Sequence, residues 1–87
     1  MKRVIEFKID ENDYDFVENN TVIFAISKTE LKLNAKEFYQ AFFANGQDYS
    51  EIELRAADDL DKTAKHVFDT VYQLFTEICE RLKEETT

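Results

Sequence analysis

Two side chains that act as base or nucleophile in many enzymes, His66 and Cys79, occur once each in this 87-residue chain. A nucleophilic cysteine or serine needs a base within hydrogen-bonding distance. Both residues fall in a segment with helical periodicity, which puts His66 on the polar side and Cys79 near the apolar edge. We therefore expect a solvated histidine, a packed thiol and no catalytic residues. A single cysteine also excludes an intramolecular disulfide and a thiolate zinc site.

Carboxylates are the abundant reactive groups, with 19 Asp and Glu against 11 Lys and Arg. Residues 10–15, DENDYD, are similar in composition to a calcium-binding loop, but the glycine that such a loop needs is missing, and Tyr14 or Val17 falls where a ligand oxygen is required. A carboxylate pair of the glycosidase kind needs a concave cleft, which so short a chain rarely forms. Phosphate-binding loops need several glycines, and Gly46 is alone. We expect no metal and no cofactor.

The acidic residues are unevenly distributed along the chain. Five of them lie within residues 10–18 without a base, interleaved with two aromatic residues. A second acidic group follows around residues 48–61, and two of its members alternate along an expected strand. We take the following as candidate partner-binding residues: Asp10, Glu11, Asp13, Tyr14, Asp15, Phe16, Glu18, Glu51 and Glu53.

The net charge of −8 indicates what kind of partner these residues would meet. Direct binding to DNA, RNA or anionic membranes is disfavoured, because such binding needs Lys and Arg to neutralise phosphates. The charge predicts instead a basic protein partner, for example a nucleic-acid-binding protein, with the aromatic residues as anchors. In size and charge the chain resembles phage-encoded inhibitors such as DNA mimics and anti-CRISPR proteins, although no motif is shared. The alternative is that the excess acid only keeps the protein soluble.

Alternating apolar residues predict a sheet in the first half of the chain. Residues 3–9, 14–18 and 21–27 form expected strands, and Asn19-Asn20 suits a tight hairpin turn between the last two. Because residues 22–26 are apolar on both faces, we expect a central strand covered on both sides. Residues 30–33 are a candidate for one further short strand.

Two helices and one more strand complete the expected elements. Asn34 can cap a helix that ends at Asn45-Gly46, and residues 50–56 alternate again as a strand. Asp58 is expected to cap a long amphipathic helix that runs to about residue 84.

The pattern predicts one α+β domain over residues 1–87, of order ββ(β)αβα. Its small antiparallel sheet has three to five strands, with both helices largely on one face. No run approaches the roughly 18 apolar residues of a membrane helix, and Glu6 and Lys8 interrupt any signal sequence, so we expect a cytoplasmic protein. The rival hypothesis to partner binding is a self-associating structural or assembly subunit, a homodimer that pairs through the C-terminal helix.

Overall fold

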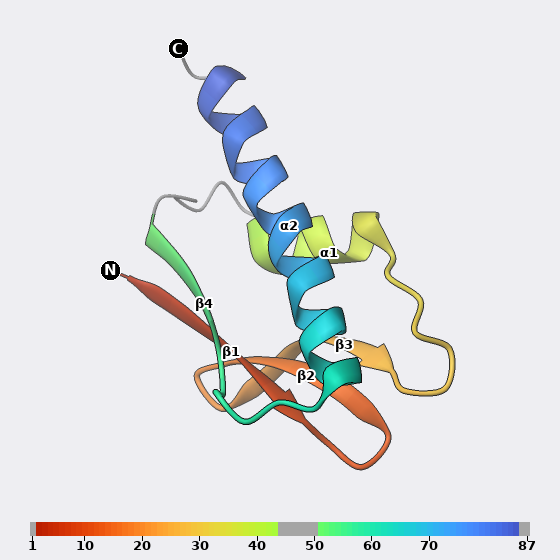
Figure 1. Cartoon of the computed structure of the whole chain (residues 1–87). Coiled ribbons are helices and arrows are strands. Elements are labelled where there is room, and N and C mark those ends of the chain that lie inside the picture. The colour runs from red at the N-terminus through yellow and green to blue at the C-terminus, as the bar shows by residue number, and fades with distance from the viewer. Residues whose placement is uncertain (1, 44–50, 86–87) are drawn as a thin grey trace.

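The computed structural model describes residues 2–43 and 51–85. Figure 1 shows the described elements in chain order: β1 (Arg3–Ile9), β2 (Asp13–Glu18), β3 (Thr21–Ser27), α1 (Ala35–Phe43), β4 (Ile52–Ala56) and α2 (Lys62–Glu85). The strands form one sheet in the order β3-β2-β1-β4. The predicted α+β class, element order and long C-terminal helix are confirmed.

The sheet is mixed, so the prediction of an antiparallel sheet was wrong in one respect. β2 is antiparallel to both β1 and β3, but β4 lies parallel to β1. The cause is the connection through α1, because a crossover helix returns the chain to the sheet in its original direction. The Asn19-Asn20 hairpin was predicted correctly: both residues have positive φ, 53° and 62°, as a tight two-residue turn requires.

β3 is an edge strand, so the prediction that it is central and covered on both faces was wrong. The apolar run of residues 22–26 is explained instead by a β-bulge. Phe24 pairs with Phe16 while Val22 pairs with Val17, which leaves Ile23 as an extra residue that packs against the core. β1 and β2 are the central strands.

Residues 30–33 form no strand. The amide of Leu31 donates to the carbonyl of Ser27 at 2.8 Å, and Leu31 has a φ of 51°. The chain therefore turns away at the end of β3 instead of extending it.

The predicted cap of α1 is confirmed, whereas the predicted cap of α2 was wrong. Asn34 caps α1 as expected, since its side-chain oxygen accepts from the amide of Glu37 at 3.1 Å. The end predicted for this helix at Asn45-Gly46 lies outside the described residues. For α2 the cap is Asp61, whose carboxylate accepts from the amide of Ala64 at 2.8 Å; the expected cap, Asp58, lies in a turn that precedes the helix.

Both helices pack on one face of the sheet, as predicted (Figure 1). The core between these layers is aromatic: all eight Phe belong to it or pack against it. Phe38 and Phe42 of α1 have ring centroids 4.2 Å apart, and Phe42 also contacts Phe16 and Phe75. Neither helix of the described chain is long and apolar enough to cross a bilayer. The opposite face of the sheet, called here the outer sheet face, is not covered by either helix.

Candidate protein-binding surface

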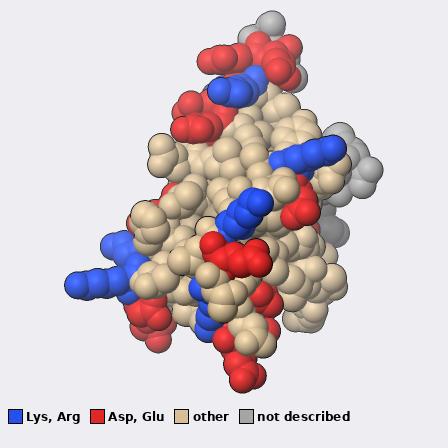
Figure 2. Space-filling view, turned by 90° about the vertical axis from the view of Figure 1, so that its right-hand side faces the viewer, with Lys and Arg blue, Asp and Glu red and all other residues tan. Residues whose placement is uncertain are grey.

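Charged side chains are not a uniform layer on this protein. On the face drawn in Figure 2, acidic and basic groups are interspersed, with wide areas of other residues between them. On this face, a surface selective for a basic partner would therefore have to come from local grouping of carboxylates rather than from net charge alone.

Such a group lies where β1 turns into β2. The carboxylate oxygens of Asp10, Asp13 and Asp15 lie within 4.8 Å of one another. The turn that brings them together is closed by a hydrogen bond from the amide of Asp10 to the carbonyl of Asp13 at 2.9 Å, and the amide of Glu11 donates to the Asp10 carboxylate at 2.8 Å. We call Asp10, Glu11, Asp13 and Asp15 the acidic turn.

The carboxylates of the acidic turn are not held in ion pairs by bases of the described residues. No ion pair of that part of the chain reaches Asp10, Asp13 or Asp15, although Lys8 lies opposite Asp15 in the register of β1 and β2. Desolvation raises the pKa of Asp15, and repulsion from Asp10 and Asp13 raises it further. Three carboxylates this close together could also hold a metal ion, although exposed acidic groups of this kind are common without one. The arrangement is thus a locally anionic surface.

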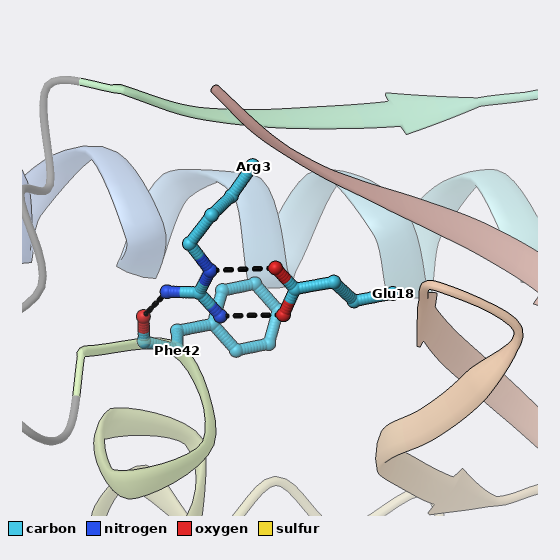
Figure 3. A network of polar contacts seen from close by, with 3 residues as sticks. All are labelled: Arg3, Glu18 and Phe42. Carbon is cyan, nitrogen blue, oxygen red and sulfur yellow. Dashed lines mark hydrogen bonds and ion pairs between the residues drawn. The ribbon is translucent and has the colours of Figure 1, made fainter. Parts of the chain in front are cut away.

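Glu18, although close in sequence, does not belong to this surface. Its carboxylate accepts two hydrogen bonds of 2.7 Å from the guanidinium of Arg3, which also donates to the carbonyl of Phe42 at 2.6 Å (Figure 3). The two side chains are only 15% and 16% exposed. Hydrogen bonding to Arg3 lowers the pKa of Glu18. The predicted role of Glu18 in partner binding is therefore corrected: this carboxylate joins β1, β2 and α1.

Tyr14 and Phe16 are core residues, 5% and 0% exposed, so they cannot be the surface anchors that the sequence suggested. The ring of Phe7 lies against both of them, with centroids 5.8 and 5.0 Å away. The alternation of side chains along a strand could have predicted that Tyr14 and Phe16 face the core. If Asp13 and Asp15 face outward, the residues that follow each of them must face the core.

The second predicted patch lies apart from the acidic turn. The register of β4 puts Glu53 beside Val4, whereas the acidic turn follows Ile9, five residues or about 17 Å further along β1. Glu53 also has ion pairs with Lys2, at 2.8 Å, and with Arg55. Hydrogen bonds from Lys2, which has the larger effect, and from Arg55 lower the pKa of Glu53. Glu51 is exposed directly before β4. The structure thus does not combine Glu51 and Glu53 with Asp10, Asp13 and Asp15 in one site.

The outer sheet face contributes residues that sequence reasoning missed. Asp15 pairs with Ala25, Asp13 with Ser27, and Val17 with Val22, all across β2 and β3. Ala25 and Val22 are exposed. The acidic turn therefore adjoins small and apolar side chains on the edge strand, a neighbourhood that only the strand register reveals.

The helical face holds a separate groove of about 200 Å³ between α2 and the end of β3 with the residues that follow it. Its lining is mainly apolar, with Ile26, Leu31 and Leu33 on one side and His66 among the residues of α2. Cys79 is thirteen residues further along α2, or about 20 Å from His66. Burial raises the pKa of the Cys79 thiol. The two groups therefore lie too far apart to act as a nucleophile–base pair.

Comparison of the chain with protein-family models, with curated proteins and with solved structures gave no match.

Proposed function

We propose that this protein is a non-catalytic binding module whose acidic turn and adjoining outer sheet face contact a basic surface of another protein. The partner class we favour is a nucleic-acid-binding protein in the cytoplasm. The module would occupy the site that phosphates otherwise fill, in the manner of a DNA mimic or an anti-CRISPR-type inhibitor.

The observation that carries the proposal is the contrast between two kinds of carboxylate. Glu18 and Glu53 have bases of this chain beside them, at 2.7 and 2.8 Å. Asp10, Asp13 and Asp15 lie within 4.8 Å of one another, and no ion pair of the described residues reaches them. Asp10 and Asp13 disfavour the ionised form of Asp15, and a Lys or Arg of a partner beside Asp15 would favour it.

The experiment is affinity capture from lysate with three forms of the protein. Wild type is compared with the double variant Asp13→Lys/Asp15→Lys and with a matched control, Glu77→Lys/Glu80→Lys. The control changes the net charge equally, but on the part of α2 that lies far from the β1–β2 connection (Figure 1). We expect wild type and control to capture the same basic protein and to release it at moderate salt. Capture of that protein by the Asp13/Asp15 variant would refute the proposal.

Self-association through α2 is the alternative, and one observation favours it. The last buried residue of α2 is Phe75, yet its apolar stripe continues with the partly buried Ile78 and Leu82. Figure 1 shows this end of α2 rising past the sheet. Light scattering at micromolar concentration tests this alternative: a dimer that becomes monomeric on Leu82→Glu would support it, and a wild-type monomer would contradict it.

A further inference from the structure

The outer edge of β3 has backbone groups without a partner among the described residues. The amide of Lys28 donates to the carbonyl of Asn12 at 3.0 Å. Because every second residue of an antiparallel strand bonds to its neighbour, Ile26 and Phe24 also bond to β2. Ala25 falls at a position between them. Its N–H and C=O therefore point away from β2, and no strand of the described chain lies on that side.

This free edge is short and well bounded. It begins after the bulge at Ile23 and ends at Ser27, where the carbonyl already accepts the amide of Leu31 at 2.8 Å. Ala25 is in the middle of it. The edge can therefore accept one short extended segment rather than a long strand.

Side chains on the outer sheet face indicate what chemistry that segment has. Asp15 lies on β2 directly behind Ala25. A fifth strand would lie two strand spacings from β2, or about 10 Å. The side chain of Ala25 is too small to block that path, so a long side chain opposite Ala25 can cross it and bring its charge to the Asp15 carboxylate.

We propose that β3 receives an extended segment of a basic protein as a fifth strand, with a Lys or Arg opposite Ala25 that pairs with Asp15. This inference rests on the proposed function and names how the partner is held. A second copy of this chain fits less well, because β3 contains no Lys or Arg to set opposite Ala25. Main-chain hydrogen bonds supply affinity in this mode of recognition, and alternate side chains supply specificity.

The probe is an acetylated and amidated peptide of seven residues in which Thr and Val alternate and the central residue is Arg. Two control peptides keep its length. One carries an N-methyl group on the backbone nitrogen of the central Arg. This removes the N–H that would donate to the carbonyl of Ala25 and keeps the charge of the guanidinium. The other has citrulline in place of Arg, which keeps the shape but removes the charge. Binding is followed by NMR titration of the amides of β2 and β3, which remain observable when Ala25 is replaced.

We expect saturable binding of the Arg peptide to the wild-type protein, and binding at least tenfold weaker for each control peptide. Ala25→Pro in the protein should also reduce the affinity for the Arg peptide at least tenfold. Proline removes the outward N–H of residue 25 without breaking the hydrogen bonds between β3 and β2. The control peptides bear on the proposal even if Ala25→Pro disturbs the fold. Absence of binding by the Arg peptide, or equal binding by its N-methyl form, would overturn the proposal.

Failure of this inference can be told from failure of the proposed function by the capture experiment. If Ala25→Pro still captures the basic protein and Asp13→Lys/Asp15→Lys does not, the acidic turn binds the partner without strand addition. If both variants still capture it, the proposed function is wrong as well.

Discussion

Asp15 and Glu18 are three residues apart on β2, yet the fold shifts their pKa values in opposite directions. Burial, Asp10 and Asp13 raise the pKa of Asp15, whereas hydrogen bonds from Arg3 lower the pKa of Glu18. For Glu18 the ionised form is favoured in the folded state, so its contribution to stability is present above the ordinary glutamate value of 4.5 and is lost as the pH falls below it. For Asp15 the sign is the reverse.

Replacement of Glu18 by glutamine should lower the free energy of unfolding by about 2 kcal/mol at pH 7, because two charge-assisted hydrogen bonds to a largely buried guanidinium are weakened. Urea denaturation measures this loss. Glu53→Gln is the matched control, and we expect no measurable loss from it, since its ion pairs are exposed. Equal losses in the two variants would contradict the structural role of the Arg3–Glu18–Phe42 contacts.

Replacement of Asp15 by asparagine should instead stabilise the protein at pH 7, by a few tenths of a kcal/mol after solvent screening. Because the pKa of Asp15 is raised, its favourable contribution is present below the ordinary aspartate value of 3.8 and is lost as the pH rises through the higher value in the folded state. The gain in Asp15→Asn should therefore grow between acid and neutral pH. Thermal unfolding across that range, with the exposed Glu77→Gln as control, checks the sign; a destabilised variant would refute it.

At the scale of elements, the start of α2 depends on one side chain. Asp61→Ala should lower the free energy of unfolding by about 1 kcal/mol, because it removes the acceptor for the amide of Ala64. Asp58→Ala is the matched control. This exposed carboxylate lies in the turn before α2, so we expect no measurable effect in urea denaturation. If Asp58→Ala lowered the free energy of unfolding more than Asp61→Ala, Asp58 would be the cap of α2, as the sequence suggested.

Elements that depend on near neighbours in the chain were predictable from the sequence. The Asn19-Asn20 turn and the Asn34 cap follow from the conformational preferences of asparagine, and the alternating or helical periods locate the strands and helices. What escaped prediction depends on residues far apart. The parallel pairing of β4, the edge position of β3 and the contact of Arg3 with the carbonyl of Phe42, 39 residues away, arise only when the layers assemble.

The candidate site was predictable in part, for the same physical reason. The acidic turn is a local grouping, so Asp10, Asp13 and Asp15 could be found from spacing alone. That Glu18 lies outside the site is seen only from its ion pair with Arg3, 15 residues away. That Glu53 lies apart from the acidic turn is seen only from the register of β4 on β1. Ala25 carries no signal in the sequence, because its small size matters only beside Asp15.

For the whole molecule, the central claim is that local grouping of carboxylates, rather than the net charge of −8, directs association. Electrostatic steering by a net charge would respond equally to any charge reversal of the same size. Steering and docking by the acidic turn would respond only to changes at that turn. The two accounts therefore differ in how the position of a charge affects the association rate.

The most direct measurement is the association rate constant for the captured basic protein, over a range of NaCl concentrations. It is taken for wild type, for Asp13→Lys/Asp15→Lys and for Glu77→Lys/Glu80→Lys. We predict that reversal at the acidic turn slows association at least tenfold at low salt and flattens its salt dependence, while the equal reversal on α2 leaves the rate within about twofold of wild type. Equal slowing by the two double variants would show that only net charge matters, and would contradict the assignment of binding to the acidic turn.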